Sequence, residues 1–116
     1  MKVIMPSKVN GTVTAPPSKS ATIRAIAASL LADGVSEITN PSFCDDAVAA
    51  FSIAESLGAA VRGWKDLIFV SGTDGFKNGY AQPGFIDCNE SGLCMRMFPP
   101  IAAIAGGEHI FNGKGT

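Results

Sequence analysis

Apolar positions along the chain recur with two different periods, which separate helices from strands. Spacing of three to four residues is typical of one helix face, and it precedes Gly34, Gly58 and the Gly106-Gly107 pair. Alternation of apolar and polar residues is typical of strands with one buried face. The pattern predicts helices over 19–32, from the Ser42 cap to about 57, and from the 89–96 turn to 105, and strands over 2–5, 9–14, 35–39, 59–62, 67–70, 85–88 and 108–111.

Residues at the helix ends refine this assignment. Ser42 lies three residues before Asp45, the spacing of a capping box at the start of the second helix. Asp45 and Asp46 are potential metal ligands, but at this position they more simply complement the helix dipole. Pro99 and Pro100 lack amide hydrogens, so we expect them to kink the third helix or to delay its regular part.

Loops complete an α+β fold. The segment 63–66 joins two short apolar runs and predicts a hairpin. The glycine-rich segment 71–84 predicts a surface loop with room for one edge strand. Its glycines are only a weak signal for a nucleotide-binding loop, because no amphipathic helix with a lysine in register follows them.

Composition limits the classes of partner. The chain has 116 residues, is 47% hydrophobic and 16% charged, and carries a formal net charge of −1. These values are typical of one globular domain. The near-zero charge gives no bulk attraction for nucleic acid or for an anionic membrane. No apolar run approaches the ~20 residues of a membrane span. We therefore expect neither nucleic acid nor membrane as a partner.

The thiols and the histidine indicate structural roles. Cys44, Cys88 and Cys94 are odd in number and lack the spacing of metal ligands, so we interpret them as reduced core thiols of a cytoplasmic protein. His109 is the single histidine and lies in a predicted strand, where we expect a satisfied structural role. A histidine-based triad or metal site is hard to build from one imidazole.

The start of the first helix is the strongest candidate site. Two prolines end an extended segment, and Ser18, Lys19 and Ser20 then open the helix. Free amides of a first helical turn attract anions, and Lys19 and Arg24 add two full charges. This stretch predicts a seat for a phosphate or carboxylate. The alternative is an ordinary helix start, in which Ser18 or Ser20 is the N-cap and both cations are solvated.

A weak internal repeat links the two ends of the chain. Each member of one residue set recurs 72 positions later in a similar helix–strand context. The matched residues are Arg24, Gly34 and Ile38 with Arg96, Gly106 and Ile110. This spacing predicts one β-α-β module followed by the beginning of a second, and we expect the chain to be cut from a larger array.

These motifs resemble those of enolpyruvylshikimate-phosphate synthase, the enolpyruvyl transferase of the shikimate pathway. The resemblance covers nearly the whole chain in the right order, and its lysine-serine-arginine motif is quite specific. The residues that carry it are Pro17-Ser18-Lys19-Ser20 with Arg24, then 40–46, 57–59, 90–92 and Met95-Arg96. The sister transferase that acts on a UDP-sugar is less similar, because an asparagine typically follows its lysine.

The resemblance implies a two-domain enzyme with its active site between domains built from repeated β-α-β-α-β-β units. This chain would then be a single N-terminal fragment, 1–116, with about one full unit and the start of another. Enolpyruvyl would pass from phosphoenolpyruvate to shikimate 3-phosphate without a metal or other cofactor. The fragment alone would be inactive. Surfaces left bare by truncation would favour self-association.

The resemblance also implies roles for individual residues. Lys19 would contact both substrates and move a proton or stabilise charge. Ser20 and Arg24 would hold shikimate 3-phosphate, while Gly92 and Arg96 would serve phosphoenolpyruvate. Leu93 departs from the family, which usually has threonine there, and this removes a hydroxyl donor.

Two further points qualify the resemblance. Glu90 stands where the family usually has asparagine, and Pro17 where it commonly has glycine. A different class of function stays open from the residues alone, namely a non-catalytic anion-binding or scaffold module. Selective binding of shikimate 3-phosphate that depends on Lys19 and Arg24 distinguishes the transferase from such a module.

Overall fold

The computed structural model describes residues 1–79, 82 and 84–115, and these form three helices and five strands. Most predicted elements are confirmed within a few residues, which supports the α+β class. In chain order they are α1 (Lys19–Leu31), β1 (Val35–Thr39), α2 (Asp45–Ser56), β2 (Ala60–Trp64), β3 (Leu67–Ser71), β4 (Gly84–Asp87), α3 (Gly92–Ala105) and β5 (His109–Asn112).

The strands form two separate sheets. β3 lies between β1 and β2 and is antiparallel to both, with Leu67 opposite Thr39 on one side and Trp64 on the other. β4 and β5 pair in parallel, which requires the crossover that α3 provides. The predicted hairpin across 63–66 is confirmed as the β2–β3 connection.

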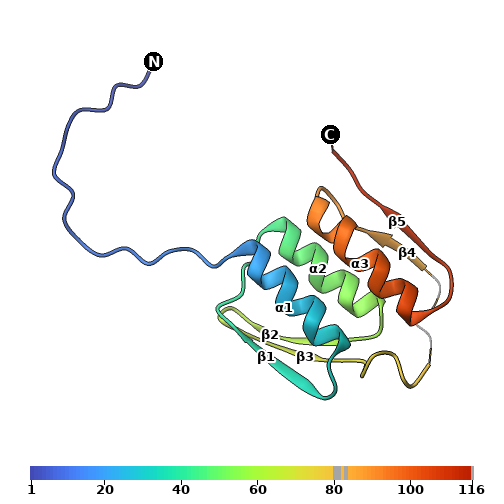
Figure 1. Ribbon diagram of the computed structural model, residues 1–116. Coiled ribbons are helices and arrows are strands. Elements are labelled where there is room, and N and C mark those ends of the chain that lie inside the picture. The colour runs from blue at the N-terminus through green and yellow to red at the C-terminus, as the bar shows by residue number, and fades with distance from the viewer. Residues whose placement is uncertain (80–81, 83, 116) are drawn as a thin grey trace.

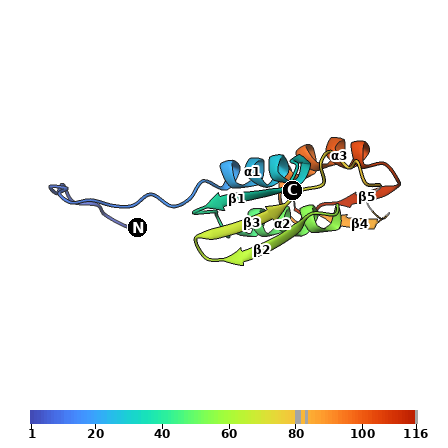
Figure 2. The ribbon, with the colours of Figure 1, turned by 90° about the horizontal axis from the view of Figure 1, so that it is seen from below.

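The helices lie side by side and run in the same direction, with their first turns at one end of the molecule (Figure 1). Seen from below, α1 and α3 lie along one side and β2 along the other (Figure 2). One continuous core joins these elements, because each helix turns its apolar face inward. Its fully buried members include Ile23, Ile26, Leu30, Ile53, Leu57, Val70 and Phe98.

The predicted strands over 2–5 and 9–14 are wrong for this structure. The segment 1–17 has no regular secondary structure and extends away from the body as an arm (Figures 1 and 2). Its larger apolar side chains are exposed, with Val9 at 97% and Val13 at 94%. Strand formation needs a hydrogen-bonding neighbour, and the alternating pattern supplies apolar side chains but no such neighbour.

The start of α2 also differs from the prediction. Cys44 occupies the N-cap position, and its side chain makes no capping hydrogen bond to the helix. Ser42 lies two residues earlier, where its Oγ accepts a hydrogen bond from the Cys44 amide at 3.3 Å. The serine therefore shapes the approach to the helix, and the capping box is absent.

The prolines of α3 do not delay its regular part. The helix is continuous from Gly92 to Ala105 with Pro99 and Pro100 inside it. Because proline has no amide hydrogen, the carbonyls of Met95 and Arg96 lose their usual intrahelical donors. Buried side chains of this helix, above all Phe98, supply the packing that offsets the loss.

The loop before β4 has no strand among its described residues 72–79 and 82, and Pro83 lies outside the described residues. His109 is half-buried, and its Nε2 lies 2.9 Å from the Gly106 carbonyl oxygen, which fits the predicted structural role. No described helix combines the length and apolar character that crossing a bilayer requires.

The repeat with an offset of 72 residues stays a prediction. Gly34 follows α1 with φ of 80° and Gly106 follows α3 with φ of 75°, and each leads into a strand. The strands pair differently, since β1 has an antiparallel neighbour and β5 a parallel one. Similar helix ends therefore occur at both places, in different sheet contexts.

Candidate functional site

The residues of the predicted anion seat lie at the start of α1. Ser18 is the N-cap, and its Oγ accepts a hydrogen bond from the Ala21 amide at 3.2 Å. Ser18, not Ser20, is therefore the cap. The amides of Lys19 and Ser20 precede Ala21 and Thr22, whose amides donate to Ser18, and are therefore available to an anion.

Lys19 forms an ion pair with Asp46 at the start of α2. The distance from Nζ to Oδ2 is 2.8 Å, with the lysine side chain 53% exposed and the aspartate 21% exposed. The hydrogen bond and the negative charge of Asp46 raise the pKa of Lys19 above its ordinary value. The ammonium is thus fully charged at neutral pH and is held at the surface between two helix starts.

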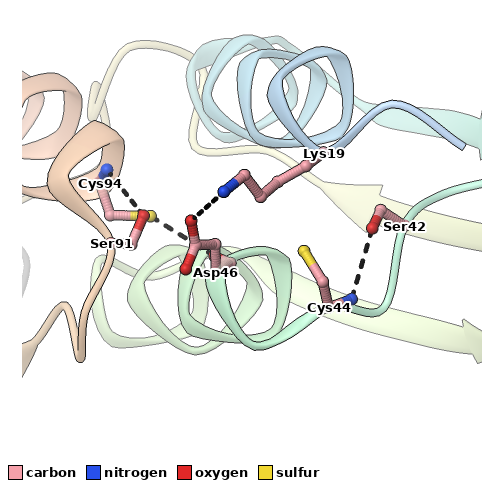
Figure 3. A network of polar contacts seen from close by, with 6 residues as sticks. All are labelled: Lys19, Ser42, Cys44, Asp46, Ser91 and Cys94. Carbon is pink, nitrogen blue, oxygen red and sulfur yellow. Dashed lines mark hydrogen bonds and ion pairs between the residues drawn. The ribbon is translucent and has the colours of Figure 1, made fainter. Parts of the chain in front are cut away.

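The first turn of α3 joins the same cluster. Ser91 is its N-cap and accepts a hydrogen bond from the Cys94 amide at 3.2 Å. The Cys94 thiol lies 3.6 Å from the backbone oxygen of Asp46 and donates to it. Asp46 consequently contacts both neighbouring helices, with its side chain toward α1 and its backbone toward α3 (Figure 3).

These contacts bring three helix N-termini together. Each first turn presents backbone amides and the positive end of a helix dipole. Their fields add at the end of the molecule where Lys19 lies, while Asp46 offsets part of the positive charge. This arrangement is suited to an anionic ligand that competes with Asp46 for the ammonium group.

Arg24 lies on another face of α1. Five residues correspond to about 140° of rotation around the helix axis, so Lys19 and Arg24 project in different directions. Ser20 and Arg24 are four residues apart and share a face. Arg24 is exposed and forms no ion pair within the described part of the chain. Ser20 and Arg24 therefore lie on one face of α1, and Lys19 projects from a different face.

Arg96 folds back over the start of its own helix. Its Nε donates a hydrogen bond to the Gly92 carbonyl at 2.9 Å. A Cβ atom on Gly92 would lie 3.0 Å from Nη2 of this arginine, so glycine leaves the guanidinium space beside the turn. Leu93 is half-buried and packs against the core, which gives this position an apolar role.

A cavity of about 420 Å³ lies between the starts of α2 and α3. Asp45, Asp46 and Glu90 supply three carboxylates to its wall, and Lys114 supplies one ammonium group. The excess of carboxylates disfavours an anion inside this cavity. An anion is better accommodated beside Ser20 and Arg24 on α1, outside this cavity.

The same region holds an exposed thiol. The Ser42 side chain and the nearby backbone amides of Ala47 and Asp46 favour the thiolate and lower the pKa of Cys44. By contrast, burial raises the pKa of Cys88 to about 11. The predicted core position is confirmed for Cys88 and Cys94, which are buried free thiols, and is wrong for Cys44, which is exposed because it lies at the start of α2. Within the described residues, no group of three or more His, Cys, Asp or Glu side chains is arranged so that it could hold a metal ion.

Sequence reasoning identified Lys19 and the helix starts but missed the partners that fix them. The partnership of Asp46 with Lys19 was not predicted, because a first-turn carboxylate is equally expected to complement its own helix dipole. The contact of Cys94 with Asp46 joins residues 48 positions apart. Sequence periodicity cannot find such a contact, since it reports only which helix face is buried.

Comparisons with known proteins agree with this architecture. The family model described as EPSP synthase (3-phosphoshikimate 1-carboxyvinyltransferase) matches residues 3–116. A 3-phosphoshikimate 1-carboxyvinyltransferase of Clostridium beijerinckii is 40% identical over 97% of this chain and 27% of its own length. The corresponding protein of Clostridioides difficile is 40% identical over 97% of this chain and 28% of its own length.

A solved structure gives the same result for the fold. EPSP synthase from Acinetobacter baumannii superposes with a TM-score of 0.73 over 90% of this chain and 24% of that one, at 19% sequence identity. The chain spans about a quarter of the length of the curated relatives it matches. With a family model that matches almost every residue, the chain belongs to the EPSP synthase family.

Proposed function

We propose that this chain supplies part of the substrate site of a transferase that moves enolpyruvyl from phosphoenolpyruvate to shikimate 3-phosphate. The observation that carries the proposal is the convergence of three helix N-termini around Lys19 in a chain of this family. Both substrates are anions, so a site for them needs ammonium, guanidinium and amide donors.

Shikimate 3-phosphate is assigned to the α1 side. Lys19, Ser20 and Arg24 would hold it, with a point charge, a hydroxyl group and a planar guanidinium. Support comes from the shared face of Ser20 and Arg24 and from the available amides of the first turn. The carboxylate-lined cavity between the starts of α2 and α3 disfavours the same phosphate.

Phosphoenolpyruvate is assigned to Lys19 with Gly92 and Arg96 of the first turns of α3, residues that do not line the carboxylate-rich cavity. Gly92 would let backbone amides approach the ligand, and Arg96 would be a supporting cation. The hydrogen bond from Arg96 Nε to the Gly92 carbonyl supports this, because it holds the guanidinium beside that turn. Leu93 supplies no hydroxyl group, so amides and cations would make the polar contacts.

In the proposed reaction, a hydroxyl oxygen of shikimate 3-phosphate forms a bond to the substituted enolpyruvyl carbon. The adjacent methylene carbon gains a proton, and the hydroxyl group loses one. The bond from that carbon to the phosphate oxygen then breaks, phosphate leaves, and loss of a methyl proton restores the double bond. Lys19 is the candidate for proton transfer or for stabilising the charge that develops.

We further propose that the chain is the N-terminal part of a two-domain enzyme and is inactive alone. The coverage of about a quarter of its relatives supports this, because a site between two domains needs both. Free thiols at all three cysteines support a cytoplasmic location. Turnover of both substrates by the purified chain would contradict the expected inactivity.

Self-association is proposed for the β4–β5 side. Phe85 and Ile110 are neighbours in the parallel register, and they are 65% and 60% exposed. Adjacent exposed apolar side chains on a two-stranded sheet favour association with another surface. Sedimentation at high concentration tests this, and a monomer throughout would remove the proposal.

The binding test is an amide NMR titration with shikimate 3-phosphate, using inorganic phosphate at equal ionic strength as the control. The transferase assignment predicts shifts at Lys19, Ser20 and Arg24 that phosphate does not reproduce. Equal shifts with both ligands would favour the non-catalytic anion-binding module. An Arg24→Ala variant should retain the fold and lose the selective shifts, since Arg24 is exposed and forms no ion pair within the described residues.

A further inference from the structure

A buried threonine links the two helix starts that carry the ion pair. Thr22 is 5% exposed and lies near the start of α1, between exposed Ala21 and buried Ile23. Its Oγ1 donates a hydrogen bond to the Ser18 carbonyl at 2.9 Å and accepts one from the Ser42 amide at 2.9 Å. Both the donor and the acceptor capacity of this hydroxyl group are thus used.

The bond to Ser42 connects segments that are 20 positions apart in the sequence. Ser18 is the cap of α1, and Ser42 belongs to the loop that leads into α2. Ser42 is itself 7% exposed, and its Oγ accepts a hydrogen bond from the Cys44 amide. The chain of contacts therefore runs from the α1 cap through Thr22 and Ser42 to Cys44, the residue immediately before α2.

This chain of contacts ends beside the ion pair. Lys19 lies one residue after Ser18, and Asp46 lies two residues after Cys44. The 2.8 Å contact between Nζ and Oδ2 depends on the offset between the two helix starts. Because an exposed lysine has many rotamers, the pair itself constrains this offset weakly, and the shared core of α1 and α2 and the Thr22 hydrogen bonds are the more rigid links.

We propose that Thr22 is a positioning residue, whose hydroxyl group sets the offset between α1 and α2 that brings Lys19 against Asp46. A buried amide left without an acceptor drives local rearrangement, so removing the hydroxyl group moves the Ser42 loop away from α1. The relevance of this offset to substrate binding rests on the proposed function. The offset itself is measurable without any substrate.

The test compares Thr22→Val with Thr22→Ser and Thr73→Val in the 116-residue chain. Valine keeps the shape of threonine and removes the hydroxyl group, whereas serine keeps the hydroxyl group. Thr73 is a matched control, because its Oγ1 donates to the Leu30 carbonyl at 2.8 Å near the other end of α1. A general loss of stability would affect both valine variants.

The readout is the pKa of Lys19, followed by NMR of its side chain against pH. Asp46 on α2 and Cys44 before it are the groups that act on this ammonium. Thr22→Val should bring the Lys19 pKa down toward that of a free lysine, while Thr22→Ser and Thr73→Val leave it raised. An unchanged Lys19 pKa in folded Thr22→Val would overturn the proposal.

Hydrogen exchange of the Ser42 amide tests the same link in the unaltered chain, should Thr22→Val fail to fold. We expect exchange at least about tenfold slower than in an unstructured peptide, since the amide is buried and bonded to Thr22. Exchange at the rate of an unstructured peptide would overturn the proposal. Neither measurement uses shikimate 3-phosphate, so a failed substrate titration leaves this inference standing on its own test.

Discussion

The charge on Lys19 is governed by a carboxylate on the neighbouring helix. Asp46 raises the lysine pKa through a hydrogen bond and through its negative charge. A raised pKa in the folded state means that the pair stabilises the fold at pH values below the ordinary lysine pKa. This contribution is lost as pH rises through the folded-state pKa of Lys19.

Asp46→Asn should therefore lower the free energy of unfolding at neutral pH, with the difference from the unaltered chain shrinking at alkaline pH. Denaturant unfolding at a series of pH values measures it. In a Lys19→Met background, the same substitution should show no such alkaline change. A difference that stays constant through the lysine titration would mean that Asp46 acts on stability without Lys19.

Thiol reactivity separates the three cysteines. Cys44 is exposed with a lowered pKa, whereas burial raises the pKa of Cys88 to about 11. With iodoacetamide at about pH 8, Cys44 should be modified first, because the thiolate is the reactive form. Peptide mass spectrometry follows the order, and Cys44→Ser should remove the fast phase. Equal rates at Cys44 and Cys88 would contradict the burial of the second thiol.

Single residues also show where sequence reasoning is strong. The helix start that contains Ser18, Lys19 and Arg24 was predicted because helix starts have a recognisable local chemistry. Asp46 and Thr22 were missed as partners because their contacts cross between helices. The hydrogen bond from Ser42 to Thr22, for example, spans 20 positions and follows from tertiary packing alone.

Among the elements, β3 is followed by a residue that lies against the end of α1. A Cβ atom on Gly72 would collide with the carbonyl oxygens of Ser29 and Ala32 at the end of α1. The Gly72 amide also donates to the Gly34 carbonyl at 2.9 Å. Glycine is required here because two backbone segments touch, and backbone atoms cannot move aside as a flexible side chain can.

Gly72→Ala should lower the free energy of unfolding by about 3 kcal/mol, the upper part of the range for overpacking. Gly92→Ala is the matched comparison, because there the added methyl group meets only the flexible Arg96 side chain. Its effect should stay within about 1 kcal/mol. Chemical denaturation of both variants measures the contrast, and similar losses in the two would show that backbone contact at Gly72 is not limiting.

Helices and internal strands were predictable because their own side chains encode a period and an end signal. Gly34 and Gly106, both at positive φ, mark the ends of α1 and α3 as expected. The α2 capping box was not predictable in the same way. Ser42 has the right spacing, but its hydrogen bond serves Cys44 instead.

At the scale of the whole molecule, the arm 1–17 stands apart from the body (Figure 1). Its alternating valines predicted strands, yet Val9 and Val13 are almost fully exposed. A strand is completed by a partner, and a strand pattern does not specify where that partner lies. The body, in contrast, has one continuous core from α1 to α3 that the helical periods predicted well.

Deletion of residues 1–17 should leave the thermal midpoint within about 3 °C of the full chain, because the arm buries little apolar surface against the body. Circular dichroism melting measures this. Retention of Ser18 keeps the α1 cap intact in the shortened chain. A fall of about 10 °C or more would show that the arm contributes to the core in solution.

For the whole molecule, we propose that Lys19 and the converging helix starts form an anion site for shikimate 3-phosphate. The most direct measurement is the dissociation constant of shikimate 3-phosphate for Lys19→Ala against Lys77→Ala. Lys77 also pairs with a carboxylate, Asp74 at 2.7 Å, but at another part of the molecule. Lys19→Ala should weaken binding by at least about tenfold, and Lys77→Ala by less than about twofold. Equal effects of the two substitutions would contradict the proposed anion site at Lys19, because binding would then follow net charge and not this site.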